Sequence, residues 1–277
     1  MTLNAVRPAG PRCDTQEHMD RLTEISAGLF VATGDLYTTN STVVRGADDG
    51  CLVIDPAVTA GEIAGLAADL GRLSLRPRAG FATHPHWDHV LWSSGLGADV
   101  PRYAAPLAVA VAERERSALI DGAQKSAPGH DLELFGRLTP LGPPADAIAW
   151  KGPAALVVTH QGHAPGHSAV FLPDSGTLVA GDMCSDIEIP LLDLDQADPV
   201  GDYLAGLNRL AALPVVRVIP GHGTVGDAAE FLRRVEADVA YLVSLQRGDE
   251  PHDPRMLADW LISEHQRQFA HVTAGRG

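Results

Sequence analysis

Cysteine is scarce in this sequence: Cys13, Cys51 and Cys184 are the only three in 277 residues, and they form no CxxC pair. Three cysteines that lie far apart in the chain cannot build the disulfide framework on which small secreted domains depend. Cys51 opens an apolar run and is expected in the core. The scarcity of cysteine therefore argues against a disulfide-stapled fold.

Basic residues and long apolar runs are lacking as well. The 21 Lys and Arg residues stand against 35 Asp and Glu, which gives a formal net charge of −14. Nucleic-acid binding needs a positive surface, so we expect no nucleic-acid partner. No stretch reaches the roughly 18 apolar residues of a membrane span, and the N-terminus lacks the apolar core of a secretion signal. We expect a cytoplasmic protein without a membrane partner.

Apolar residues are plentiful, at 45% of the chain, which is enough for a substantial core. Residues 1–20 contain Pro8, Pro11 and little periodicity, and we expect a flexible N-terminal arm there. Residues 21–277 are expected to form one domain. The reason is that both halves share one plan, with strands, a helix and then a strand that ends in polar side chains.

Hydrophobic periodicity separates the expected strands from the expected helices. Short apolar runs bounded by turn residues predict strands at 24–31, 41–45, 51–54, 79–82, 169–173, 177–180 and 215–219. Apolar residues three or four apart predict helices at 59–70, 106–120, 199–212, 226–246 and 254–269. Residues 121–149 are rich in Gly and Pro and weakly patterned, which indicates a binding loop that forms one pocket wall.

The densest chemistry lies in the segment Thr83-His84-Pro85-His86-Trp87-Asp88-His89. Three imidazoles and one carboxylate directly follow a short apolar run, a pattern that predicts a buried strand ending in a ligand-rich loop. Neutral imidazole and carboxylate suit zinc and related divalent ions. The segment therefore predicts a metal site at the end of a strand.

Three later segments add candidate ligands beside small residues, where the backbone can turn sharply. Asp182 follows one apolar strand, and His222 follows another. The turn Gly162-His163-Ala164-Pro165-Gly166-His167-Ser168 offers two histidines, and His160 precedes it. Cys184 lies two residues after Asp182, but we expect it to be structural because the ligand set is complete without it.

The ordered set HxHxDH, H, D and H resembles the metallo-β-lactamase-fold hydrolase superfamily over about residues 29–222. The resemblance implies an α/β fold, a four-layer αββα sandwich of two mixed sheets flanked by helices. It implies one metal on His84, His86 and His167 and a second on Asp88, His89 and His222, with Asp182 bridging the two. His167 is preferred over His160 and His163, because its Pro-Gly-His-Ser context matches the family.

Two divalent ions about 3.5–4 Å apart can share one water and lower its pKa from about 15.7 towards about 7. The metal-bridging hydroxide would attack the substrate, and Asp88 would orient it as the catalytic residue. We expect a metal-dependent hydrolase that cleaves a small-molecule substrate, an ester, thioester or lactone. The expected cofactors are two zinc ions, with manganese or iron as alternatives. Trp87 and Trp92 stand beside the ligands and suit an uncharged acyl group, although core packing is expected for at least one of them.

Other branches of the superfamily stay open as alternatives. They are a β-lactamase-like amide hydrolase, a phosphodiesterase or nuclease, a mononuclear iron sulfur dioxygenase and, least favoured, a non-catalytic binding protein. Acyl-homoserine lactonases typically carry a tyrosine soon after the bridging Asp, where this chain has Ser185, and the next tyrosine is Tyr203. Glyoxalase II has a basic C-terminal site, whereas Arg233 and Arg234 are expected here as solvated surface residues.

Two interpretations of Asp55 and one of His130 complete the expectations. Asp55 follows the strand at 51–54. It is either a turn residue that ends this strand or an acid that hydrogen-bonds behind the metal loop, since such acids commonly orient ligand histidines. His130 is expected to be a surface or pocket histidine and not a ligand.

Overall fold

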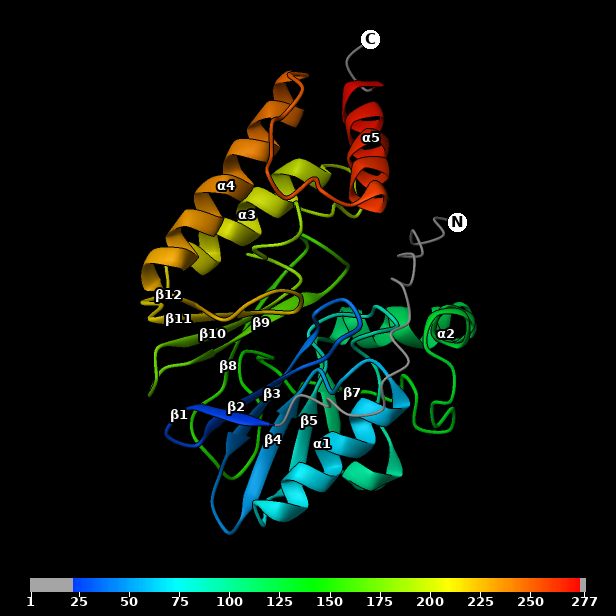
Figure 1. The fold of residues 1–277 in the computed structure, drawn as a ribbon, viewed down its shortest axis with the longest axis vertical. Helices are drawn as coiled ribbons and strands as arrows, with labels where there is room; N and C mark the ends of the chain where they lie inside the picture. Colours follow the sequence, from blue (N-terminus) through cyan, green and yellow to red (C-terminus); the bar gives the residue numbers. More distant parts are fainter. Residues whose placement is uncertain (1–21, 275–277) are drawn as a thin grey trace.

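The computed structural model describes residues 22–274, so the arm predicted at 1–20 lies outside the described residues. Two β-sheets face each other, and helices cover the outer side of each (Figure 1). The predicted four-layer αββα sandwich of two mixed sheets is confirmed. No helix in the described range has the length and hydropathy of a membrane span.

The first sheet has the strand order β1-β2-β3-β4-β5-β6-β7. Its strands are β1 (Thr23–Ser26), β2 (Leu29–Thr33), β3 (Asn40–Arg45), β4 (Gly50–Ile54), β5 (Arg76–Phe81), β6 (Arg102–Ala104) and β7 (Thr139–Pro140). β1 to β4 pair antiparallel, and β4 to β7 pair parallel. Chain direction therefore brings the C-terminal ends of β4 and β5 to the same edge.

The second sheet has the order β12-β11-β10-β9-β8. Its strands are β8 (Leu156–His160), β9 (His167–Leu172), β10 (Thr177–Gly181), β11 (Arg217–Pro220) and β12 (Gly226–Asp227). Only β10 and β11 pair parallel in it. Their C-terminal ends also meet at one edge, and each is followed by a candidate ligand.

Five α-helices and one short 3₁₀ helix lie in the described range. They are α1 (Ala60–Arg72), η1 (Ser94–Leu96), α2 (Pro106–Ser126), α3 (Pro199–Ala211), α4 (Ala228–Arg247) and α5 (Asp259–Ala274). Thr59 and Glu62 begin α1 with a reciprocal capping box. Gly248 ends α4 in a left-handed conformation (φ 74°) that costs glycine little.

Strand alternation produces the four layers. Cys51 and Val53 of β4 pack on the helix side, whereas Leu52 and Ile54 point into the core between the sheets. This is the period of two that a strand imposes on its side chains. Full burial of each such apolar side chain contributes roughly 1.5–3 kcal/mol. Buried residues such as Leu52 therefore hold the edge that carries the site.

Hydrogen bonds join the two sheets at that edge. The Asn40 backbone N–H donates to the Gly221 carbonyl at 2.8 Å, and the Asn40 side chain donates to the Pro220 and Gly223 carbonyls at 2.9 and 2.8 Å. The Ser168 N–H donates to the Thr83 carbonyl at 2.8 Å. The ends of strands from both halves are thus fixed relative to one another.

Several expected elements differ from the structure. The single strand expected at 24–31 is two strands, β1 and β2, and the helix expected from 226 begins at Ala228, after the short strand β12. The helix expected to end at residue 120 continues as α2 to Ser126, so the irregular segment starts later than predicted. The last helix begins at Asp259, not at Pro254, because residues 254–258 form turns and a bend, in which Arg255 donates to the Asp253 carboxylate. The short strand β7 lies inside the segment predicted as irregular.

Candidate metal centre

Asp55 holds the loop that follows β5. Its Oδ1 accepts a hydrogen bond from the Thr83 backbone N–H at 2.8 Å, and its Oδ2 accepts one from the Thr83 hydroxyl at 2.6 Å. The same Oδ2 lies 3.0 Å from His89 Nδ1. The interpretation of Asp55 as an acid behind the loop is therefore confirmed.

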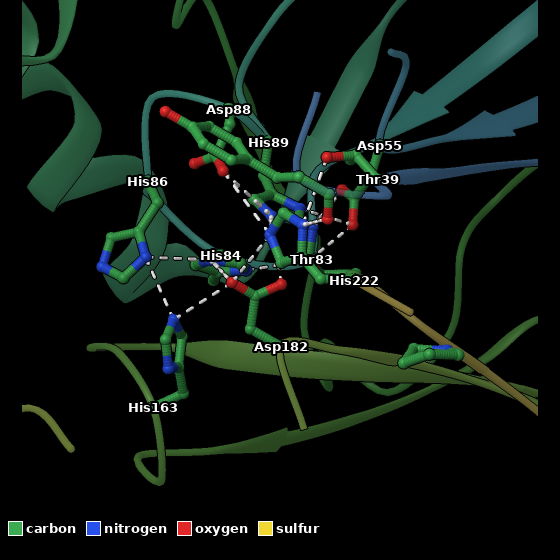
Figure 2. Close-up of polar contacts among 12 residues, drawn as sticks. Thr39, Asp55, Thr83, His84, His86, Asp88, His89, His163, Asp182 and His222 are labelled. Carbon is green, nitrogen blue, oxygen red and sulfur yellow. Dashed lines mark hydrogen bonds and ion pairs between the residues drawn. The ribbon is translucent and has the colours of Figure 1, made fainter. Parts of the chain in front are cut away.

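Seven side chains converge at the edge between the sheets in two groups (Figure 2). The first group is His84, His86, His163 and Asp182, and the second is Asp88, His89 and His222. Within each group, one ligand atom from every residue lies within 4.8 Å of the others. All seven are buried except His86, which is partly exposed. Such groups can hold divalent metal ions.

The structure corrects the choice among the later histidines. His163 Nε2 lies 3.1 Å from His86 Nδ1 and 3.4 Å from Asp182 Oδ2, so His163 stands where His167 was predicted. His167 Nε2 instead accepts the Asp182 backbone N–H at 3.2 Å, and His167 Nδ1 lies 3.1 Å from His160 Nε2. The reason is local: His167 is the first residue of β9, whereas His163 lies in the preceding turn and can reach the group.

In His84 and His163, the ring nitrogen that points away from the first group is Nδ1. The hydrogen bond at this nitrogen determines which way the lone pair of the ring points. The Thr83 hydroxyl gives its proton to Asp55, so its oxygen, 3.0 Å from His84 Nδ1, accepts the proton of that nitrogen. The Leu191 carbonyl, which can only accept, lies 2.8 Å from His163 Nδ1. In the neutral rings of His84 and His163, the lone pair is therefore on Nε2, facing the group.

The second group is oriented in the same way. His89 Nδ1 donates to Asp55. His222 Nδ1 lies 3.1 Å from the Tyr37 carbonyl, which can only accept, and 3.1 Å from Thr39 Oγ1. The lone pair of each ring is therefore on Nε2, and the Nε2 atoms of His89 and His222 lie 3.3 Å apart. Two lone pairs facing each other at that distance require a cation between them, either a proton or a metal ion.

Asp182 lies between the two groups. Its Oδ2 is 3.4 Å from His163 Nε2 and 3.3 Å from His222 Nε2, and its Oδ1 is 3.1 Å from His89 Nε2. Asp88 Oδ2 is 3.5 Å from His222 Nε2 at the far side of the second group. A single carboxylate therefore faces histidines of both groups, which is the arrangement of a bridging ligand.

Two glycines allow the backbone to approach this closely. Gly181 has a left-handed backbone (φ 59°), and a Cβ there would lie 2.5 Å from His167 Nε2. A Cβ at Gly221 would overlap Asp182 Oδ1. A side chain at Gly181 would push against His167 and one at Gly221 against Asp182, which explains why a glycine precedes both Asp182 and His222.

The electrostatics differ between the histidines. Burial lowers the pKa of His86 to about 3, so this ring is neutral at physiological pH. Burial also lowers the pKa of His89, but three nearby carboxylates, led by Asp182, outweigh it and raise that pKa well above its usual range. Burial raises the pKa of Asp182, whereas the surrounding histidines, led by His222, lower it well below its usual range. The carboxylates of Asp182, Asp55 and Asp88 thus favour a positive charge beside them, carried by a proton on His89 or by a metal ion.

The aromatic residues beside the loop divide into two roles. Trp92 is 2% exposed, and its Nε1 donates to the Gly97 carbonyl at 2.9 Å, so it belongs to the core. Trp87 is partly exposed and makes an edge-to-face contact with Tyr37, whose ring makes another with His222; both centroid distances are 6.2 Å. Tyr37 was not singled out from the sequence, although it lies beside the second group.

Four further expectations have clear outcomes. Arg234 is not a solvated surface residue: it is 1% exposed and donates to the Cys184 carbonyl at 3.3 Å and the Thr224 carbonyl at 2.9 Å. Arg233 is exposed, as predicted. Cys184 and His130 belong to neither group, as expected, and both are buried, so His130 is not a surface histidine. The predicted basic pair is thus split between surface and interior.

Residues 34–222 match the metallo-beta-lactamase superfamily. The chain belongs to this superfamily, as its fold and its His/Asp groups indicate. Most members of the superfamily are metal-dependent hydrolases. No curated protein matches the chain.

Solved structures show the same fold. A beta-lactamase domain protein from Burkholderia ambifaria is 19% identical with a TM-score of 0.68, over 94% of this chain and 89% of that one. A metallo-beta-lactamase family protein from Thermus thermophilus is 20% identical with a TM-score of 0.66, over 92% and 95%. A protein crystallised in a di-iron-bound form is 29% identical with a TM-score of 0.57, over 74% and 98%.

Proposed function

We propose that the two groups bind two divalent metal ions and make the protein a hydrolase of small esters, thioesters or lactones. The ligands of the first ion are His84, His86 and His163, those of the second are Asp88, His89 and His222, and Asp182 is shared by both. The observation that carries the proposal is the set of outer hydrogen bonds, which turn histidine lone pairs towards one another and towards carboxylates.

The spacing of the first group fits an ion. His86 Nδ1 is 3.0 Å from His84 Nε2 and 3.1 Å from His163 Nε2. A tetrahedral ion with bonds of about 2.0–2.1 Å places its ligand atoms about 3.3–3.4 Å apart. Imidazole and carboxylate ligands suit zinc, manganese and iron. We propose zinc first, and the relative with two bound irons supports iron as the alternative.

Two bound ions would supply a water of lowered pKa and positive charge for a developing oxyanion. The chain supplies the positioning. Asp88 is 5% exposed and lies within the second group, where its carboxylate would orient the attacking water and accept its proton. Asp55 and Leu191 hold the rings of His89 and His163 in place, so the ligand atoms need no rearrangement.

The surroundings support an uncharged substrate. Tyr37 and Trp87 form an aromatic pair beside His222 and suit an apolar acyl group. The net charge of −14 disfavours a polyanion, whose binding depends on phosphate neutralisation.

Metal analysis and a substrate panel test the proposal. Protein purified without chelator should contain close to two divalent ions per chain. With the same metal loaded, kcat/KM should be higher for esters, thioesters or lactones than for phosphodiesters and β-lactams. A chain that takes no second ion under saturating zinc or manganese contradicts the dinuclear centre. A clear preference for phosphodiesters contradicts the substrate class.

A further inference from the structure

Gln268 of α5 is fully buried and lies outside the residues that match the superfamily. Its Oε1 accepts the Leu192 backbone N–H at 2.5 Å, and its Nε2 donates to the Pro190 carbonyl at 3.1 Å. The second Nε2 proton goes to the Tyr241 hydroxyl at 3.0 Å. These partners fix the orientation of the amide, because an N–H only donates and a carbonyl only accepts. Gln268 therefore holds the backbone on both sides of Leu191.

The segment held in this way has no regular secondary structure over residues 189–193. No strand ladder or helix fixes the direction of its carbonyl groups, and Pro190 has no N–H to contribute. The two backbone bonds to the Gln268 amide take the place of a ladder. They leave the Leu191 carbonyl between them.

The Leu191 carbonyl accepts the Nδ1 proton of His163 at 2.8 Å. This bond fixes the tautomer of His163 and turns its Nε2 towards His86 Nδ1 and Asp182 Oδ2, at 3.1 and 3.4 Å (Figure 2). Partners of this kind commonly set the orientation and basicity of a ligand histidine. A continuous path thus runs from Gln268 through Leu191 to His163.

We propose that Gln268 is a positioning residue for the first metal ion, acting through the Leu191 carbonyl on His163. This inference rests on the proposed metal centre. The helix α5 would then contribute to metal affinity from outside the part of the chain that supplies the ligands. Loss of the Gln268 amide would free the Leu191 carbonyl and let the His163 ring rotate away from the first group.

Zinc affinities of the full chain test the proposal, measured for both ions by competition with a chromogenic chelator. Gln268→Met keeps the length of the side chain and removes its three hydrogen bonds. We expect the affinity for one of the two ions to fall about 10- to 100-fold, the usual effect of losing such a partner, and the other affinity to stay unchanged. In a His163→Gln background, Gln268→Met should cause no further loss.

Two control variants separate positioning from general destabilisation. Gln266→Met changes an exposed glutamine of the same helix. Tyr241→Phe removes one partner of the Gln268 amide but leaves the Pro190 and Leu192 bonds in place. Both should bind two zinc ions as tightly as the unmodified chain. If Gln268→Met does not fold, Gln268→Glu, which keeps the acceptor for Leu192 and loses the donor to Pro190, carries the same expectation.

The failures can be told apart. If the unmodified chain binds fewer than two zinc ions, the proposed metal centre is wrong. If it binds two and the Gln268 variants bind both as tightly, the positioning role of Gln268 is wrong. The inference is also overturned if Gln268→Met lowers the affinity for both ions equally, or if Tyr241→Phe lowers the affinity as much as Gln268→Met does. Either result would show only a loss of stability.

Discussion

Replacing Asp55 with asparagine tests whether the buried acid behind the loop sets the second metal site. Asp55 is 2% exposed and accepts three protons, two from Thr83 and one from His89. An asparagine has one acceptor oxygen, so its NH₂ group must face at least one of these donors in either orientation. The lost bond involves a buried carboxylate and costs about 1.5–3 kcal/mol.

Two measurements follow from that figure. For a domain of this size, about 2–4 °C of Tm is lost per kcal/mol, so Tm of the metal-free protein should fall by about 3–12 °C. Affinity for the second ion should fall about 10- to 100-fold, because His89 loses the partner that orients its ring. Differential scanning calorimetry and competitive zinc titration measure the two effects separately.

Asp186 provides a matched control for Asp55. Its carboxylate accepts the Thr224 backbone N–H at 2.8 Å and the Thr224 hydroxyl at 2.6 Å, the same pair of bonds that Asp55 makes with Thr83. Asp186→Asn should therefore lower stability without weakening the second ion. The reasoning is refuted if Asp55→Asn binds two zinc ions with unchanged affinity, or if Asp186→Asn weakens the second ion equally.

Three further predictions concern the ligands themselves. His163→Gln should lose one ion, whereas His167→Gln should keep both, and elemental analysis of the two variants decides between these histidines. The raised pKa of His89 keeps this ring protonated in the metal-free protein at pH 7, so binding of the second ion should release about one proton, and the affinity for this ion should rise with pH. Calorimetry in buffers of different ionisation enthalpy measures the proton release, and a result of no released proton would contradict the prediction. Asp88→Asn should reduce kcat by at least about 10²-fold, the scale of lost general-base catalysis, with little change in Tm of the metal-free protein. Wild-type turnover in this variant would remove Asp88 from its assigned role.

Local sequence pattern is sufficient to predict most of the strands and the candidate ligands that lie close together in the chain. The run 51–54 alternates between the two cores as its apolar residues predict, and His84, His86, Asp88 and His89 converge because they share one loop. The choice of His163 over His167 depends on where β9 begins, which the Gly/Pro turn does not fix.

Contacts between distant segments could not be predicted from local pattern. Gln268 and Pro190 are separated by 78 positions in the chain. Helical periodicity predicts that Gln268 lies on a helix, but it does not predict the contact with Pro190. Arg234 appeared to be half of a surface pair, because charge alone does not indicate the buried Cys184 and Thr224 carbonyls that it satisfies. Arg234 depends on how α4 packs on the second sheet, and Gln268 depends on how α5 packs against α4.

The division of the ligands between the two sheets has a mechanical consequence. Each proposed ion takes ligands from both halves of the chain: His84 and His86 opposite His163 in the first group, and His89 opposite His222 in the second. A bound ion would therefore cross-link the two sheets at the edge where the hydrogen bonds of Asn40 and Ser168 already join them. An ion at 1,000 times its Kd adds about 4.1 kcal/mol to the stability of the folded chain. Metal supply would then affect the stability of the folded chain as well as the activity of the site.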